Sequence, residues 1–358
     1  MKRILQTLAV LAALGAVGGA AVMFGGLYNV SARKGHWSIT PWVLHTTFRN
    51  SVQLRAPAES EVPDLTQPGM VALGAMHFDA GCKTCHSAPG QERWAVPTAM
   101  VPHPPHITEA VEPWAANELH WIVDEGVKMS GMPYWPAERT DDIWPVVAFL
   151  QRVDEMTEGE YDALTLHPPV PAGAPDDLPY CAMCHGVSGR SSNPLIPRLD
   201  IQPQAYLEQT LLAYADGARE SGIMHVASTR VSPTALMELA AWFAKQDVTA
   251  GPEIGQADAD LIARGETLAM NGTQDVPACT ACHGPKADQP RSASFPRLAG
   301  QSEVFLTQQL RLWRDGRRGG GSRAMLMFKS AQDLSDADIA ALSAWFASQP
   351  ATKPQSAQ

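Results

Sequence analysis

Three short stretches of the chain hold the residue types that could do redox or metal chemistry. Each has two cysteines separated by two residues and followed directly by a histidine, at 82–86, 181–185 and 279–283. C-x-x-C-H is the attachment signature of haem c. Its two thiols lie one helical turn apart, so both can form thioethers with one porphyrin, and the histidine can then ligate the iron. The sequence therefore predicts three covalently bound haem c groups.

The three motifs use every cysteine of the chain. A single C-x-x-C-H would leave a zinc site or a thioredoxin-like pair open. Three copies leave no further cysteine to complete a zinc site, to build a disulfide framework or to serve as a reactive thiol. The predicted thioether residues are Cys82, Cys85, Cys181, Cys184, Cys279 and Cys282. The predicted histidine ligands of iron are His86, His185 and His283.

Length and composition indicate a folded protein of two or three domains. The chain has 358 residues, of which 45% are hydrophobic and 18% are charged. Its net charge of −10 disfavours nucleic-acid binding, which needs clustered lysine and arginine. Residues 58–162 carry 18 acidic and 5 basic side chains. Such an excess either keeps the protein soluble or steers a cationic partner, such as a soluble cytochrome, towards the haem.

The N-terminus begins with an apolar segment. Residues 4–30 are uncharged, and this run exceeds the core of a cleavable signal peptide and suffices to cross a bilayer as a helix. Val30-Ser31-Ala32 is only a weak cleavage site. We therefore predict that residues 1–30 form an uncleaved transmembrane anchor. Basic pairs flank the segment on both sides, so the positive-inside rule does not settle its orientation.

Residues 31–62 form an amphipathic juxtamembrane segment. Trp37, Trp42 and Phe48 occur together with Arg49 and Arg55, and residues 1–57 contain six basic residues and no acidic one. This composition is typical of a helix that lies on a membrane surface or docks onto a membrane subunit.

The remainder of the chain is built from repeats. The first cysteines of successive motifs are 99 and 98 residues apart, which indicates three tandem domains. Helices are predicted at 141–153, 232–246 and 335–349, and the last two end in similar Trp-Phe-Ala sequences. Ser335 with Asp338 predicts a capped start for the last helix.

Each repeat resembles a class I cytochrome c, with a haem motif, a Pro-x-Leu segment, a distal methionine and a C-terminal helix. The third is the most similar, through residues 264–268 before its motif and Phe295-Pro-Arg-Leu-Ala-Gly-Gln301 after it, a pattern typical of soluble di-haem bacterial cytochromes. The first resembles the cytochrome modules of oxidase and dehydrogenase complexes. The resemblance implies an all-α fold. It also implies that the backbone carbonyls of Pro197 and Pro296 fix the Nδ1 atoms of the proximal histidines.

The resemblance, together with the repeats, predicts the domain boundaries. The expected cytochrome domains are residues 63–162, 163–251 and 252–349, followed by a tail at 350–358. Five prolines between His167 and Tyr180 leave no room for a helix before the second motif. We therefore expect the second domain to be truncated and its haem to be covered by a neighbouring domain.

The distal iron ligands are predicted to be methionines. In the first domain Met132, followed by Pro133, fits the Gly-Met-Pro pattern of the family better than Met129 does. In the second domain Met224 is chosen, with the adjacent His225 as the alternative.

In the third domain Met327 competes with Met325. It lies seven residues before Leu334, the same spacing that separates Met224 from Val231. A cluster of arginines nearby either offsets haem propionates or faces an acidic partner. Its members are Arg311, Arg314, Arg317, Arg318 and Arg323.

These features favour electron transfer over catalysis, since histidine and methionine together fill both axial positions of the iron. The predicted protein is a tri-haem cytochrome c anchored in the bacterial inner membrane, with its globular part in the periplasm. It would serve as the cytochrome subunit of an oxidase or dehydrogenase complex, or carry electrons from a quinol-oxidising complex. The alternative is a haem enzyme, such as a di-haem peroxidase or a thiosulfate-oxidising cytochrome, which needs an open or switchable iron.

Overall fold

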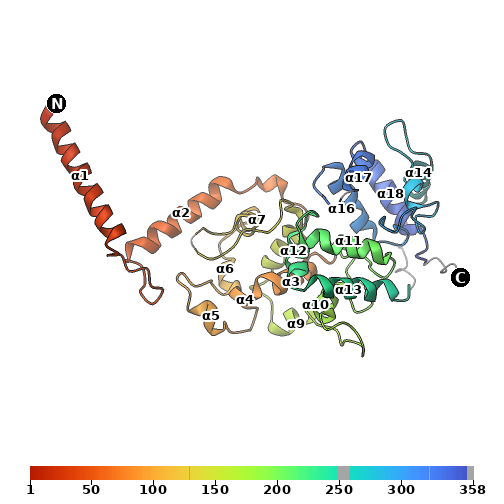
Figure 1. Cartoon of the computed structure of the whole chain (residues 1–358), viewed down its shortest axis with the longest axis horizontal. Coiled ribbons are helices and arrows are strands. Elements are labelled where there is room, and N and C mark those ends of the chain that lie inside the picture. Colours follow the sequence, from red (N-terminus) through yellow and green to blue (C-terminus); the bar gives the residue numbers. More distant parts are fainter. Residues whose placement is uncertain (129, 249–257, 322, 353–358) are drawn as a thin grey trace.

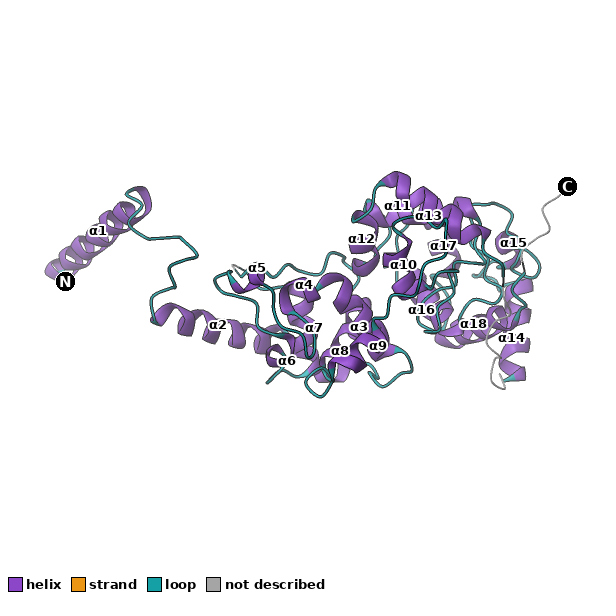
Figure 2. Ribbon diagram, turned by 90° about the horizontal axis from the view of Figure 1, so that it is seen from below, coloured by secondary structure: helices purple, strands orange, loops and turns teal. Residues whose placement is uncertain are grey.

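The computed structural model describes residues 1–128, 130–248, 258–321 and 323–352. Within these ranges every regular element is a helix and none is a strand, so the all-α fold class is confirmed there (Figure 2). The predicted boundary between residues 251 and 252 and most of the predicted tail lie outside the described residues. We call residues 63–162, 163–251 and 252–349 the first, second and third units.

Two helices precede the first unit. Helix α1 (Lys2–Phe24) has a mean hydropathy of 2.1 and no buried residue, and by length and composition it could cross a membrane. It extends away from the rest of the chain (Figure 1). Helix α2 (Ile39–Arg55) lies between α1 and the first unit. Val52 is fully buried, and Phe48 makes an edge contact with Trp114, with ring centroids 5.4 Å apart. The C-terminal half of α2 is therefore packed on the first unit.

The first unit is built around two crossing helices. Its elements are η1 (Glu59–Glu61), α3 (Met70–Gly81), α4 (Lys83–His86), α5 (Ala95–Thr98), α6 (Ile107–Ala110), α7 (Ala116–Glu125), η2 (Asp141–Ile143), α8 (Trp144–Leu150) and α9 (Glu158–Leu164). Helices α3 and α8 approach so closely at Gly74 that a Cβ there would meet the Pro145 carbonyl oxygen at 1.8 Å. The helix expected at 141–153 is shorter, since a 3-10 turn replaces its first residues and it ends at Leu150.

The second unit has fewer helices. They are α10 (Leu178–His185), α11 (Gln204–Ala215), α12 (Gly222–Thr229) and α13 (Pro233–Lys245). Residues 165–177 contain no helix, and α10 begins with Pro179 in its first turn. Helix α3 of the first unit packs against the second unit at its C-x-x-C-H motif. Met76 of α3 clusters with Met183 and Ile196, and Cys184 packs against them.

The third unit repeats the helix crossing of the first. Its helices are α14 (Ala259–Asn271), α15 (Thr280–His283), α16 (Glu303–Arg314), α17 (Ala324–Ala331) and α18 (Asp336–Ser348). At Gly265 a Cβ would meet the Ala341 carbonyl oxygen at 2.0 Å. The predicted cap of the last helix is confirmed: Ser335 Oγ accepts from Asp338 N–H at 3.1 Å, and the Asp338 carboxylate accepts from Ser335 N–H at 3.2 Å.

Candidate haem sites

Each C-x-x-C-H motif forms the last turn of a short helix. The His86 N–H donates to the Cys82 carbonyl at 3.0 Å, and the His283 N–H donates to the Cys279 carbonyl at the same distance. This turn places the two thiols of a motif on neighbouring positions of one helix face, as attachment to one porphyrin requires. All six cysteines are free thiols, so none is committed to a disulfide.

The first thiol of each motif lies in an apolar environment. Cys82, Cys181 and Cys279 each pack against the hydrophobic core of their own unit. Burial raises the pKa of Cys82 to about 12 and those of Cys181 and Cys279 to about 11. A neutral thioether is compatible with such surroundings, whereas a metal-bound thiolate would require the deprotonated form. The motif residues therefore fit covalent haem c.

Proline carbonyls orient two of the three histidines that are predicted to ligate iron. His283 Nδ1 lies 3.0 Å from the Pro296 carbonyl oxygen, as the resemblance implied. His86 Nδ1 lies 3.0 Å from the Pro105 carbonyl oxygen, a partner that the sequence analysis missed. A proton on Nδ1 leaves Nε2 as the atom that can ligate iron, so these bonds set the tautomer that a haem ligand needs.

His185 departs slightly from this arrangement. Its Nδ1 atom is buried and has no hydrogen bond of standard geometry within the described part of the chain. Burial lowers the pKa of His185 to about 4, and the Pro197 carbonyl opposes this shift. His185 therefore lies near the Pro197 carbonyl, as expected, but does not form a hydrogen bond of standard geometry with it.

The predicted distal methionines are half-buried. Met132 lies in a tight turn in which its carbonyl accepts from Val127 N–H at 3.1 Å. Its competitor Met129 lies outside the described residues. In the third unit Met327 packs against the hydrophobic core, whereas Met325 is 58% exposed. The surroundings of the third site thus favour Met327, as the sequence spacing did.

Met224 lies in α12, whose start is capped by Ser221. The neighbouring His225 is held by its Nδ1 atom, 2.7 Å from the Tyr214 carbonyl oxygen. His225 also lines a pocket between the first and second units. This Nδ1 contact is of the same kind as those of His86 and His283, so it does not exclude His225 as an iron ligand. Met224 stays the predicted ligand on its spacing from Val231, with His225 as the alternative.

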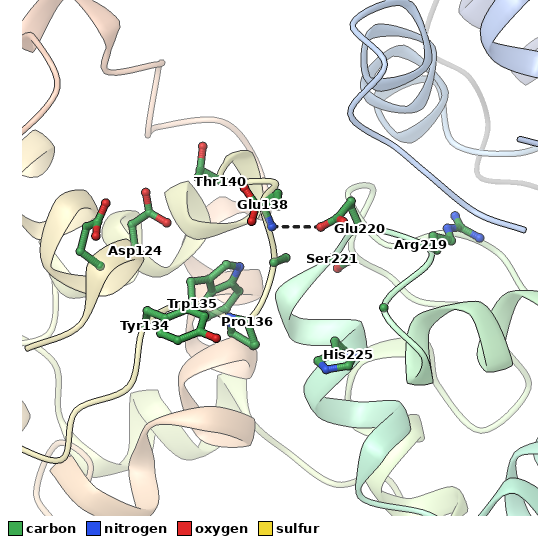
Figure 3. Close-up of a pocket in the computed structure, with 13 residues that line it drawn as sticks. Asp124, Tyr134, Trp135, Pro136, Glu138, Thr140, Arg219, Glu220, Ser221 and His225 are labelled. Carbon is green, nitrogen blue, oxygen red and sulfur yellow. Dashed lines mark hydrogen bonds between the residues drawn. The ribbon is translucent and has the colours of Figure 1, made fainter. Parts of the chain in front are cut away.

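The pocket beside His225 is acidic. It encloses about 470 Å³, and its lining includes Asp124, Glu138, Trp135 and Glu220. Figure 3 shows the carboxylates of Asp124 and Glu138 on one wall and Glu220 on the other, where the Glu138 N–H donates to Glu220 Oε2 at 3.0 Å. Burial raises the pKa of Asp124. The negative potential of the first unit therefore continues into its boundary with the second.

A buried carboxylate beneath this pocket joins the two units. Asp142 accepts hydrogen bonds from the Trp135 indole N–H at 2.9 Å, and from the Ser221 hydroxyl and the Gly222 N–H, both at 3.0 Å. A Cβ at Gly222 would lie 2.2 Å from the Trp135 indole nitrogen. Asp142 was not predicted from the sequence, since its partners in the second unit are about 80 residues away and nothing local marks those contacts.

Two families match separate parts of the chain. Residues 69–150 match the family described as cytochrome C oxidase, cbb3-type, subunit III, and residues 262–350 match the family described as cytochrome c.

Individual relatives match about half of the chain. Cytochrome c4 of Pseudomonas aeruginosa is 36% identical over 167 residues, which are 46% of this chain and 81% of the relative. A protein named thiosulfate dehydrogenase electron acceptor, from Thiomonas intermedia, is 35% identical over 190 residues, 52% of this chain and 86% of the relative. The crystal structure of reduced cytochrome c4 from Pseudomonas stutzeri, 33% identical, superposes with a TM-score of 0.44 over 47% of this chain and 93% of that one.

Proposed function

The chain belongs to the class I c-type cytochromes, and from that premise we propose that it is a membrane-anchored tri-haem cytochrome c that transfers electrons in the periplasm. The observation that carries the proposal is the threefold recurrence of one motif turn. Haem c supplies one-electron redox chemistry when it is bound. In each unit the two cysteines would hold the porphyrin, and one histidine and one methionine would ligate the iron. The proposed ligand pairs are His86 with Met132, His185 with Met224, and His283 with Met327.

The second unit is proposed to be the middle of the electron path. It contacts the first unit through Met183 and Cys184, which pack against α3. It contacts the third unit through Gln202, whose side chain bonds to the backbone of Arg297. The first and third units also touch, since the Gln308 amide donates to Asp141 Oδ2 at 2.8 Å. The proposed middle position therefore rests on the order of the three motifs along the chain.

The proposed location and partners follow from the N-terminal helices and from the relatives. Helix α1 would anchor the chain in the inner membrane, and α2 would lie against the bilayer or a membrane subunit. One relative is named as the electron acceptor of a thiosulfate dehydrogenase. We therefore propose a periplasmic dehydrogenase, an oxidase or a quinol-oxidising complex as redox partner, with this chain as its cytochrome subunit.

The test begins with the number of haems. Intact-mass measurement of the protein purified from membranes should give the chain plus three haems. A Cys181→Ala, Cys184→Ala variant should lose one haem and keep the other two. A native gel of mildly solubilised membranes, stained for covalent haem, then identifies the partner from co-migrating bands. A protein with fewer than three haems would contradict the tri-haem proposal, and a protein that migrates alone would contradict the subunit role.

A further inference from the structure

Two equivalent arginines of the second and third units meet at the boundary between these units. Arg219 and Arg318 are 99 residues apart, the spacing of the repeats, and are 6% and 8% exposed. Their backbones run side by side, since Arg219 forms an isolated antiparallel bridge with Gly319, and Glu220 N–H donates to the Arg318 carbonyl at 3.0 Å. Repetition of the fold thus brings two buried positive charges together.

The side-chain partners of both guanidinium groups are neutral. Gln309 Oε1 accepts from Arg219 at 3.4 Å and from Arg318 at 2.9 Å, and the Tyr206 hydroxyl lies 3.5 and 3.4 Å from them. Arg219 also stacks over the Tyr214 ring and Arg318 over the Trp313 ring.

Other buried arginines of this chain are neutralised. Arg139 forms an ion pair with Asp141, and Arg198 forms one with Asp200, both at 2.5 Å. Within the described residues, neither Arg219 nor Arg318 forms such a pair. Burying an unpaired charge is costly, and a second like charge beside it adds to that cost.

The positive potential at this point affects neighbouring groups. Burial, together with the charge of Arg219, lowers the pKa of Arg318 to about 10. Burial alone would raise the pKa of Tyr206, but the two arginines outweigh it and lower this pKa to about 8. Both pKa shifts have the sign expected at a site where positive charge is not balanced by a carboxylate.

We propose that Arg219 and Arg318 form a binding site for carboxylate groups, and that its ligands are the propionate side chains of the haems in the second and third units. This inference rests on the proposed function, because it requires haem at both motifs. The guanidinium fork suits carboxylates, which it can bind through two parallel hydrogen bonds.

Both arginines also contact aromatic residues that pack against the cores that would surround these haems. Tyr206, which bonds to both guanidinium groups, packs against the core that includes Cys181. Trp313, which stacks on Arg318, packs against the core that includes Cys279 and Met327. The two arginines would therefore be positioning residues that raise the reduction potentials of both haems and couple them electrostatically.

The test measures potentials in the full-length protein, after intact mass has shown that all three haems are attached. In Arg219→Gln and Arg318→Gln, the loss of a buried positive charge should stabilise the ferric state. We expect the equilibrium constant for reduction of the second and third haems to fall about tenfold, which corresponds to 59 mV for one electron. The first haem should not change. Arg311→Gln is the matched control, because it removes an arginine of the same unit whose side chain is 55% exposed and screened by solvent.

Two further measurements separate the alternatives. Arg219→Lys and Arg318→Lys keep the charge and should keep most of the potential. If the Gln variants lose thermal stability while all potentials stay constant, the arginines are structural only and the proposal is wrong. The wild type is also titrated with inorganic phosphate at constant ionic strength. Potentials that depend on phosphate, and lose this dependence in the Gln variants, would assign the site to a solution anion instead of the propionates. A wild type without haem in these units would overturn both the proposed function and this site, whereas attached haems whose potentials stay constant in the Gln variants would overturn this site alone.

Discussion

Gln202 and Gln301, which lie 99 residues apart, make the same two hydrogen bonds across the boundary between the second and third units. Gln202 accepts from Arg297 N–H at 3.0 Å and donates to the Arg297 carbonyl at 2.9 Å. Gln301 accepts from Arg198 N–H at 2.8 Å and donates to the Arg198 carbonyl at 3.1 Å. Both arginines belong to Pro-Arg-Leu segments, so the two units meet through equivalent surfaces, in the manner of a two-fold interface.

We expect Gln202→Ala to destabilise this interface. Both glutamines are buried, so removal of the amide leaves the Arg297 N–H and carbonyl without their partner, at a cost of about 1–3 kcal/mol. Differential scanning calorimetry of the haem-loaded protein should show a lower Tm. Gln209→Ala is the control, because Gln209 bonds to Ser294 across the same interface but is exposed. Equal Tm values for the two variants would contradict the prediction.

The carboxyl of Asp142 should make stability depend on pH. Burial raises its pKa, although Arg139 and the hydrogen bonds from Ser221 and Trp135 oppose this, and Asp141 adds to it. Between the ordinary Asp pKa and the raised folded value, the folded state holds a proton that the unfolded state has released. Stability therefore falls as pH rises through this window.

Asp142→Asn should remove that contribution and flatten the dependence of Tm on pH in the same window. The amide has one acceptor oxygen where the carboxylate has two, so the variant should also lose about 1–3 kcal/mol of stability. Asp154→Asn, which alters an exposed carboxylate of the same unit that does not contribute to the pKa of Asp142, is the control and should retain the slope. An Asp142→Asn protein with an unchanged slope would show that another group titrates.

The choice between the two methionines of the third unit can be tested by spectroscopy. Because three methionine-ligated haems are proposed, Met327→Ala should lower the far-red absorption band of methionine-ligated ferric haem by about one third. It should also allow carbon monoxide to bind one of the three reduced haems. Met325→Ala is the matched control and should do neither, because Met325 is exposed and Met327 is packed against the core. The reverse result would make Met325 the ligand and the spacing argument wrong.

The sequence predicted what is locally encoded and missed what depends on long-range contacts. The Ser335–Asp338 cap involves residues three apart, so its pattern is visible in the chain itself. The Pro105 carbonyl is 19 residues from His86, in a proline-rich loop whose path no periodicity reveals. Asp142 has no local signal for its contacts in the second unit.

The pairing of Arg219 with Arg318 was hidden for a different reason. The two arginines are 99 residues apart, but the proposed ligands Met224 and Met327 are 103 apart. The extra residues lie around the glycines at 319–321, so an alignment on the methionines does not match the arginines. The equivalence emerges only when the two loops are seen side by side.

The N-terminal half of α2, together with Trp37 just before it, should bind a lipid surface even without α1. Trp37, Ile39 and Trp42 are exposed, and residues 1–57 contain no acidic side chain that would repel an anionic bilayer. Aromatic and aliphatic side chains beside basic ones are the composition that holds a helix in the headgroup region. A chain that begins at residue 31 should therefore co-sediment with vesicles containing phosphatidylglycerol, and more weakly at high salt.

In that shortened chain, replacement of Trp37 and Trp42 by Ser should abolish co-sedimentation. Leu166→Ser, which removes an exposed apolar side chain of the second unit, should leave it intact. The C-terminal half of α2 should stay folded in both variants, because Val52 and the Phe48–Trp114 contact lie outside the altered positions. If the Trp variant still binds vesicles, the bilayer contact lies elsewhere. If the unaltered shortened chain does not bind them, the exposed face of α2 instead contacts a protein subunit, since exposed apolar patches of this kind mark interaction surfaces.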